Sequence, residues 1–564
     1  DQRNEVPAAI FPNSVEEPIS WQAHVYDDKN RLRSTLYSDG SSATNAYSCC
    51  RLLWTQNRDG FKTLRSAETG KDHLYYAMEE VSLADLPGGG NGHRITQHFM
   101  DALGRETNTV VTAVFEPGSA KVPDCVTTGP RTSETTSYPE GTSDYSIRTD
   151  PRGVRTVTTR TSHDDREVTE TQTFSPTNLV NPVILSRNID YRNGTSITQR
   201  EWDGQWTRET RLTDYDASGC RIDTQVAESS DHPAVTNNVT LCDFLGRAVS
   251  TITPLGIASN FYDGASMRIL ASTRSGQPPV YNLYNVLGEQ VGAVVSGVTN
   301  RTDASYEAVS GEVWRVTDSL AGAVRSMIRE RLTGLSITLR RHSVALGADN
   351  VTNEVVAVWD EPTQTLVETQ TSSLRATPSI RVTKHGRTIA ETSVDGDRNF
   401  FFDPYGRVFY TERKPSDSAA WLSETWLGFN DHGDVEEFGT FIGGGDTYAA
   451  TFHTFDAFGR SIITTDALGN AVTNAYDALG RPVATSGATY PIRYGYDALG
   501  RMSALSTTRD GTAWDTTLWR YDFATGLATN KVYADNSVIA YTYTDDGKPL
   551  RTTWARSAWR EQIY

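Results

Sequence analysis

Apolar and polar residues alternate with a period of two along much of this chain. The clearest stretches are RSIITTDALGNAVTNAYD at 460–477 and NSVIAYTYTDDGKPLRTTW at 536–554, which are rich in Thr, Val, Ile and Tyr. This alternation is typical of β-strands, and the Asp, Gly and Asn clusters between the runs are typical of turns. Helical patterns are scarce, and the best candidate, 319–334, contains Gly322 in its interior. The pattern therefore predicts an all-β chain.

A five-residue motif, Asp-x-x-Gly-Arg, separates many of these runs. An Asp that opens a type I turn accepts a backbone hydrogen bond from two residues on, and a left-handed Gly lets the chain return. The Arg is placed to reach the Asp of its own turn or of a neighbouring hairpin. Because one active site needs one constellation, a motif that recurs this often is interpreted as a structural turn. The Asp and Gly of the six full copies are Asp101 and Gly104, Asp243 and Gly246, Asp403 and Gly406, Asp456 and Gly459, Asp477 and Gly480, and Asp497 and Gly500.

Two variations on the motif support the same interpretation. Asn30 stands in the Gly place of a seventh copy, and Asn is the next best residue for a positive φ. An aromatic residue usually precedes the Asp, as at Tyr476 and Tyr496. We expect this ring to pack against the neighbouring strand, where cross-strand aromatic pairs contribute about 0.2–1 kcal/mol.

The Tyr-Asp-x-x-Gly-Arg copies at 476–481 and 496–501, supported by 402–407 and 455–460, resemble the Rhs/YD-repeat family. The resemblance is strong over 395–555 and patchy before it. It implies a continuous sheet of repeated β-hairpins curled into an open or partly closed shell, similar to the bacterial Rhs, toxin-complex and teneurin shells. It also implies a secreted, periplasmic or cell-surface location.

The organisation expected along the chain has four parts and no linker between independent domains. They are an N-terminal arm at 1–20, divergent β-hairpin repeats at 21–395, clear YD repeats at 396–555 and a C-terminal tail at 556–564.

Composition narrows the classes of function. The chain has 70 acidic and 53 basic residues, a net charge of -17, which disfavours nucleic-acid binding. No apolar run approaches the roughly 20 residues that a membrane-spanning helix needs. No HxH, HExxH or CxxC spacing occurs, so we expect neither a metal site nor a cofactor. Cys220 and Cys242 lie about one repeat apart, and are either a disulfide pair or two free thiols.

Three weak candidates for chemistry remain, each built on histidine. A polysaccharide lyase would need a base such as His or Tyr and a cation such as Arg to neutralise a uronate carboxylate. An ordinary surface or core role is the competing interpretation of every residue in this set. The candidates are His93 with Arg94 and His98, Arg340 with His342 on one strand face, and His453.

Three functions stay open at this point. The first is an exported bacterial YD-repeat shell protein that binds or encapsulates another molecule, such as a toxin-type polypeptide cargo. The second is an enzyme, a lyase that acts on an anionic polysaccharide along the concave face of the sheet. The third is a cell-surface adhesion module without chemistry. The sequence leaves the oligomeric state open.

Overall fold

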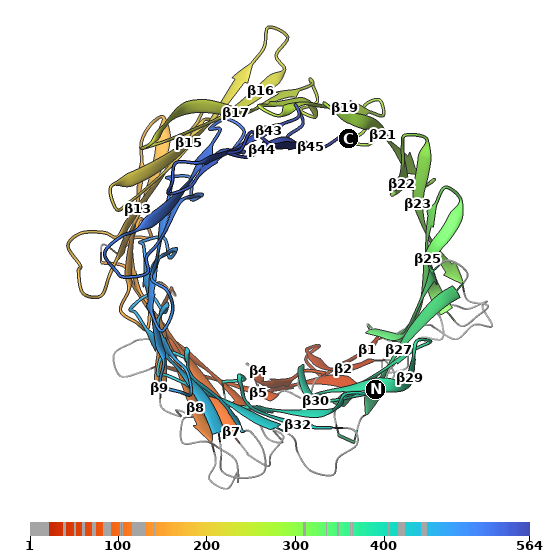
Figure 1. Cartoon of the computed structure of the whole chain (residues 1–564). Helices are drawn as coiled ribbons and strands as arrows, with labels where there is room; N and C mark the ends of the chain where they lie inside the picture. The colour runs from red at the N-terminus through yellow and green to blue at the C-terminus, as the bar shows by residue number, and fades with distance from the viewer. Residues whose placement is uncertain are drawn as a thin grey trace. The chain divides into compact units, whose positions relative to one another are not determined.

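The computed structural model describes most of the chain between residues 22 and 563. The description leaves out 1–21, 38–40, 50–51, 59–61, 70–74, 83–91, 102, 104, 116–129, 140, 308–311, 334–335, 347–348, 361, 364, 385, 404, 416–422, 442–447 and 564. Every regular element in the described residues is a β-strand, and 45 strands form one sheet (Figure 1). None of the described segments is a helix long and apolar enough to cross a bilayer.

The strands follow one another at short intervals. The first part of the chain holds β1 (Gln22–Tyr26), β2 (Leu32–Tyr37), β3 (Ser42–Tyr47), β4 (Leu52–Gln56), β5 (Lys62–Thr69), β6 (Tyr75–Ser82), β7 (Gly92–Met100), β8 (Glu106–Phe115), β9 (Pro130–Ser137), β10 (Tyr145–Thr149), β11 (Arg155–Ser162), β12 (Arg166–Phe174), β13 (Ile184–Tyr191), β14 (Ser196–Trp202), β15 (Gln205–Tyr215), β16 (Arg221–Ser229), β17 (His232–Cys242), β18 (Ala248–Thr253), β19 (Gly256–Tyr262), β20 (Ile269–Arg274), β21 (Gln277–Tyr284) and β22 (Gln290–Val295). The second part holds β23 (Val298–Glu307), β24 (Glu312–Leu320), β25 (Ala323–Thr333), β26 (Ser336–Leu346), β27 (Asp349–Asp360), β28 (Thr365–Ser372), β29 (Arg375–Lys384), β30 (Arg387–Ser393), β31 (Gly396–Phe402), β32 (Val408–Lys414), β33 (Ser423–Phe429), β34 (Val435–Phe441), β35 (Tyr448–Phe455), β36 (Ser461–Thr465), β37 (Ala471–Tyr476), β38 (Pro482–Gly487), β39 (Ile492–Tyr496), β40 (Met502–Thr507), β41 (Asp515–Tyr521), β42 (Ala528–Val532), β43 (Val538–Tyr543), β44 (Pro549–Thr553) and β45 (Trp559–Glu561).

Pairing is local: each strand hydrogen-bonds to the next strand in the chain. The registers are antiparallel, as in β36–β37 and β37–β38, where Val472 lies opposite Thr464 on one side and Gly487 on the other. No pairing among the described strands joins β45 back to β1, so the ladder is open. The predicted fold class, an all-β continuous sheet of repeated hairpins, is confirmed.

The best helical candidate of the sequence, 319–334, falls in the hairpin of β24 and β25. Ala321 and Gly322 connect the strands with φ values of 51° and 82°. Two consecutive residues with positive φ form the tight turn that matches the twist of a hairpin. Ala321 and Gly322, which lie inside the helical candidate, therefore form the turn of a hairpin.

The Asp-x-x-Gly-Arg motif forms one hydrogen-bonded turn wherever it is described. At Asp477, Oδ1 accepts the backbone N–H groups of Leu479 at 3.0 Å and Arg481 at 2.9 Å, while Oδ2 accepts Arg481 Nε at 2.6 Å. Gly480 has a φ of 84° and donates its N–H to the Asp477 carbonyl. Gly104 lies outside the described residues. The Asp–Arg contact recurs at Asp27, Asp101, Asp243, Asp403, Asp456 and Asp497.

The motif arginine also joins each hairpin to the next one. The guanidinium of Arg460 lies over the ring of Tyr476, 5.2 Å from its centroid, and donates to the Asp477 carbonyl at 2.6 Å. In return the Tyr476 hydroxyl donates to the Ser461 carbonyl at 2.9 Å. The aromatic residue before the Asp therefore stabilises the preceding turn, by stacking under its arginine and by hydrogen-bonding to its backbone. The same stacking occurs in Arg31–Tyr47, Arg247–Tyr262, Arg407–Phe429, Arg481–Tyr496 and Arg501–Tyr521.

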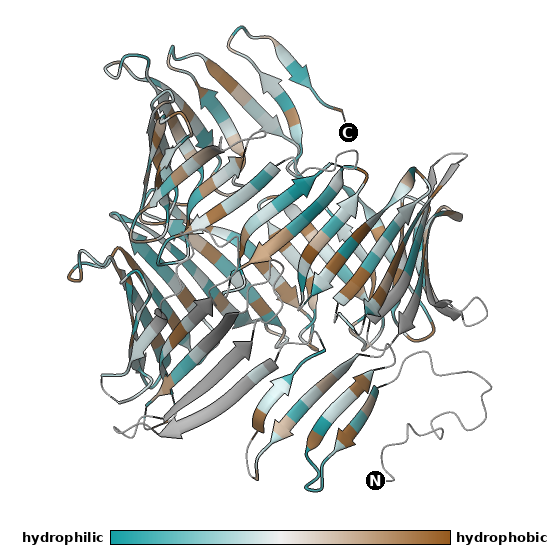
Figure 2. Ribbon diagram, turned by 90° about the horizontal axis from the view of Figure 1, so that it is seen from below, coloured by the Kyte–Doolittle hydropathy of each residue, from teal (hydrophilic) through white to brown (hydrophobic). Residues whose placement is uncertain are grey.

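The chain divides into two compact units, each made of two separate segments. Unit 1 is 1–135 with 299–451, and unit 2 is 136–298 with 452–564. Apolar and polar residues are interspersed along the strands of both (Figure 2). Burial is correspondingly local: in unit 1 a small aromatic cluster forms from Phe401, Phe409, Tyr410 and Phe429. Stability then rests on many turn contacts as well as on apolar packing.

Unit 2 consists of two segments, which we call the first strip (136–298) and the second strip (452–564). The two strips contact each other through hairpin turns at the ends of their strands. Asp203 Oδ2 accepts the N–H of Ala478, and Asp231 Oδ2 accepts the N–H of Ala498, both at 3.1 Å. His232 stacks on Phe523 with ring centroids 4.3 Å apart. We call this line of contacts the seam.

Candidate functional site

One face of the sheet in unit 1 carries a row of charged side chains across neighbouring strands. The registers of β28 to β32 place Glu368 opposite Arg381, Arg381 opposite Glu391, Glu391 opposite Arg398, and Arg398 opposite Arg413. Residues directly opposite each other in antiparallel strands project from the same face. Five charges from five strands therefore stand side by side.

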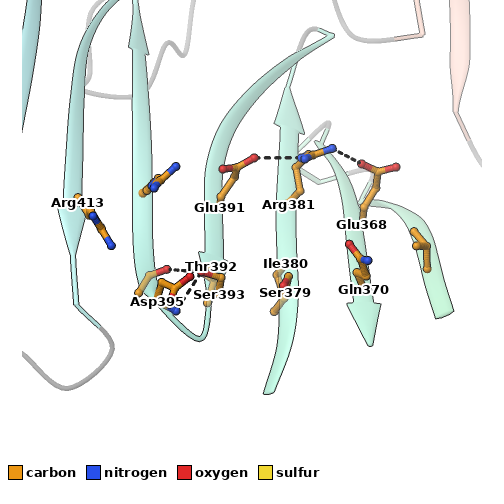
Figure 3. Close-up of a pocket in the computed structure, with 13 residues that line it drawn as sticks. Glu368, Gln370, Ser379, Ile380, Arg381, Glu391, Thr392, Ser393, Asp395 and Arg413 are labelled. Carbon is orange, nitrogen blue, oxygen red and sulfur yellow. Dashed lines mark hydrogen bonds and ion pairs between the residues drawn. The ribbon is translucent and has the colours of Figure 1, made fainter. Parts of the chain in front are cut away.

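The carboxylates of this row are held by a single arginine. Arg381 Nε lies 3.2 Å from Glu391 Oε1, and its Nη1 lies 3.9 Å from Glu368 Oε2 (Figure 3). Arg398 and Arg413 are exposed, and neither forms an ion pair with any described carboxylate. Two like charges directly opposite each other destabilise a strand pair. An anion between the two guanidinium groups would remove that repulsion.

The row lines a groove made of two adjoining cavities. The first, of about 470 Å³, includes Arg381, Arg398 and Arg413 in its wall. The second, of about 440 Å³, includes Arg340 and His342. The cavities share wall residues on β27, β28 and β29, so together they form one groove across β26–β32. Their volumes are in the range of small-ligand sites, roughly 300–1,000 Å³.

The groove is polar and more basic than the protein around it. Its remaining wall is rich in hydroxyl and amide side chains, for example Gln370 and Ser379. Five arginines and three carboxylates line the two cavities, whereas the whole chain has a net charge of -17. Arginine is suited to carboxylates because its planar fork can donate two parallel hydrogen bonds. The groove can therefore bind an anionic chain, with hydroxyl and amide partners along its length. The charged lining residues are Arg340, Arg375, Arg381, Arg398, Arg413, Glu368, Glu391 and Asp395.

Of the predicted catalytic candidates, the structure brings Arg340 and His342 together in the groove. They are two residues apart on β26 and both line the second cavity. Arg340 Nε donates to Glu330 Oε1 at 2.6 Å, and the Glu330 side chain is buried. Arg340 is thus already paired with a carboxylate, while His342 faces Asn353 in the register.

Neither of the other two described histidine candidates, His98 and His453, is among the residues that line this groove. His98 Nδ1 lies 3.2 Å from Glu106 Oε2, and His453 Nδ1 lies 3.2 Å from Thr464 Oγ1. The backbones of His93 and Arg94 belong to β7, but their side chains lie outside the described part of the structure. Within the ranges that the structure covers, no three His, Cys, Asp or Glu side chains gather as a metal site.

The disulfide considered between Cys220 and Cys242 is absent, and both are free thiols. The register explains why: Ile222 lies opposite Leu241 in β16–β17, so one step further it is Arg221 that lies opposite Cys242. Neighbouring residues project from opposite faces of a strand. Cys220 therefore does not face Cys242. Burial comes first among the causes that raise the pKa of the Cys220 thiol, followed by the Asp216 carboxylate.

Sequence reasoning missed the arginines of β29, β31 and β32. Arg381, Arg398 and Arg413 lie 15 to 17 residues apart and share no motif. The signal that could have found them is a basic residue at the same distance from successive hairpin turns. Using that signal requires the register of every strand, which the sequence does not supply.

Residues 476–513 match the family model described as RHS Repeat, whereas no curated protein matches the chain. Similar solved structures include the crystal structure of TcdB2-TccC3-Cdc42, 11% identical over 94% of this chain and 31% of that one, with a TM-score of 0.30. Another is the Tc holotoxin pore of Photorhabdus luminescens, 10% identical over 94% of this chain and 37% of that one, with a TM-score of 0.35.

The chain spans about a third of the length of these two proteins, and both TM-scores lie below 0.5, so neither likeness carries an argument about function. The RHS match falls on the residues that carried the family resemblance, including the turns at Asp477 and Asp497. Residues 476–513 therefore carry the RHS repeat, and the same hairpin turn recurs along the described chain.

Proposed function

We propose that this YD-repeat protein is an exported shell-wall protein that binds a polypeptide cargo through an acidic segment, which the groove across β26–β32 holds. The observation that carries the proposal is the Arg398–Arg413 pair. These two guanidinium groups lie directly opposite each other without a described carboxylate partner, in a basic groove of an otherwise acidic chain.

The binding mode follows from the chemistry of the wall. Carboxylates of the cargo pair with Arg398 and Arg413, and backbone amides of the cargo hydrogen-bond to side chains such as Gln370. Hydrogen bonds to charged groups contribute about 1.5–3 kcal/mol each. Because the pair is exposed to solvent, added salt should weaken binding.

The test measures the affinity of the purified full chain for fluorescent poly-L-glutamate. Fluorescent poly-L-lysine, a polymer of opposite charge, serves as the comparison. We expect poly-L-glutamate to bind and poly-L-lysine not to bind. The double variant Arg398→Glu with Arg413→Glu should lower poly-L-glutamate affinity by at least about tenfold, since one charged hydrogen bond already accounts for that much. Arg556→Glu, an exposed charge reversal in the turn before β45, is the matched control and should change affinity little.

Equal loss of affinity in both variants would show nonspecific charge attraction and would contradict the proposal. Export is tested separately by fractionating the source cells and locating the protein with an antibody. Recovery only in the cytoplasmic fraction would contradict that part.

A second candidate function rests on the place of Arg340 and His342 in the same groove. A polysaccharide lyase would use His342 as the base and Arg340 to neutralise a uronate carboxylate. Incubation with a panel of polyuronates should then give a rise in the ultraviolet absorbance of unsaturated products, which His342→Ala abolishes. No rise in absorbance on any polymer would contradict the lyase function and favour the binding function.

A further inference from the structure

Along each strip of unit 2, successive hairpin turns lie alternately at the two ends of the strands, so each strip has two rows of turns. Turns such as Asp243–Arg247 and Asp477–Arg481 lie in one row, which we call the YD rim. Turns such as 203–204 and 230–231 lie in the other row, which we call the opposite rim. The seam joins the opposite rim of the first strip to the YD rim of the second strip. The YD rim of the first strip and the opposite rim of the second strip take no part in the seam, and we call these two the leftover rims.

On the YD rim of the second strip, turns that pack against the first strip have a small residue at the second motif position. In the turn at Asp497 the second motif residue is Ala498, which is 3% exposed, and its N–H donates to Asp231 across the seam. In the turn at Asp477 the equivalent Ala478 donates to Asp203. Small residues at this position allow the two rims to approach closely.

The YD rim of the first strip carries large apolar residues at the same motif positions, and they face solvent. Phe244 is 82% exposed, although it holds the second motif position, whose counterparts Ala478 and Ala498 face the seam. Leu287, the third residue of its turn, is 78% exposed. Three neighbours in the same run of turns, Leu245, Met267 and Val286, are also exposed. Exposed apolar residues on successive turns of one rim are typical of interaction surfaces.

The leftover rim of the second strip offers the matching chemistry. Leu468 is 87% exposed and Tyr490 is 72% exposed, and Trp554 is exposed in a later turn of the same rim. We infer that the YD rim of the first strip docks onto the opposite rim of the second strip of a second copy of this chain. This contact joins the same two kinds of rim as the seam, with the larger side chains of Phe244 and Val286 at the motif position that Ala478 and Ala498 hold in the seam.

The inferred contact is head to tail, because it joins two different surfaces of the protein. A variant with one damaged rim keeps the other rim intact. This inference goes beyond the proposed cargo binding, which concerns residues of unit 1, so either can fail without the other.

The test measures the mass of the full chain by sedimentation velocity over a range of concentrations. We expect wild-type protein to associate as concentration rises. Phe244→Asp with Leu287→Asp should stay monomeric, and so should Leu468→Asp with Tyr490→Asp. An equimolar mixture of the two double variants should form a dimer that does not grow further, because each supplies the rim that the other lacks.

Val180→Asp is the matched control, since Val180 is exposed in the loop between β12 and β13 and belongs to neither leftover rim. It should associate like wild type. Circular dichroism and thermal melting verify that all variants fold. A wild-type chain that stays monomeric at every concentration would overturn the inference, as would association that survives both double variants or a mixture that fails to pair.

Discussion

The guanidinium carbon of Arg481 lies 4.6 Å from the ring centroid of Tyr496, the aromatic residue that precedes the next Asp-x-x-Gly-Arg turn. Arg481 also donates from Nε to Asp477 of its own turn at 2.6 Å. The Tyr496 hydroxyl donates to the Pro482 carbonyl at 3.0 Å. One arginine thus closes its own hairpin and supports the ring of the next hairpin. This two-way contact explains why the aromatic residue, the Asp and the Arg recur together.

The Arg481–Tyr496 contact should be measurable as a coupling energy. We expect a double-mutant cycle of Arg481→Ala and Tyr496→Ala to give a coupling of about 0.5–2 kcal/mol, because a partly desolvated cation–π contact is of this size. Urea unfolding of the four proteins gives the free energies. Pairing Arg481→Ala with Tyr281→Ala, an exposed tyrosine of β21, is the control and should give additive effects. Equal coupling in both cycles would contradict a specific contact.

Gly480 has a φ of 84°, so its replacement should cost stability through the backbone alone. A Cβ at this position would meet only Arg460 Cδ, at 4.0 Å, and would therefore cause no clash. Gly480→Ala should lower the free energy of unfolding by about 1–2 kcal/mol, the cost of a left-handed residue with a Cβ. Asn30→Gly, in an equivalent turn where Asn30 already has a φ of 62°, should not destabilise the protein. A neutral Gly480→Ala would disprove this account of the turn.

The turn aspartates should make stability depend on acid pH. Hydrogen bonds from the Arg247 side chain hold the pKa of Asp243 below its usual value, and Arg31 does the same for Asp27. A carboxyl group with a lowered folded pKa stabilises the fold above its unfolded pKa, and this stabilisation is lost as pH falls through the folded value. Urea midpoints should therefore stay level near neutrality and fall below about pH 4.

Asp243→Asn provides the control for that pH dependence. Asn285 shows that an amide oxygen can accept the same two backbone N–H groups, from Leu287 and Glu289. The variant keeps the turn but lacks the titrating group, so its midpoint should depend less steeply on pH in the acid range. An unchanged slope would mean that other carboxyl groups dominate acid unfolding.

The burial of the three described cysteines predicts an order of alkylation. Cys49 is exposed and should react with iodoacetamide in the native protein, whereas Cys242 is buried and should react only after unfolding. The raised pKa of Cys220 should slow its reaction, because the thiolate is the nucleophile. Peptide mass mapping without reductant checks all three. A peptide that links Cys220 to Cys242 would contradict the structure.

The sequence by itself determined the local architecture of this protein. The hydrogen bonds of the turn at Asp477 stay within five residues, so residue type and spacing were enough to predict it. Alternation with a period of two gave the strands and hence an all-β sheet. The helical candidate at 319–334 is a hairpin, because Ala321 and Gly322 adopt positive φ values that the sequence pattern does not reveal.

Only the tertiary structure decided which distant residues meet. Arg398 and Arg413 face each other because of a strand register, which depends on hydrogen bonds between whole strands. The contact between Asp231 and Ala498 joins residues 267 positions apart. The exposed Phe244 and the covered Ala498 hold the same motif position, and packing against the other strip alone distinguishes them. Local chemistry fixed each hairpin, whereas packing between hairpins determined the groove, the seam and the leftover rims.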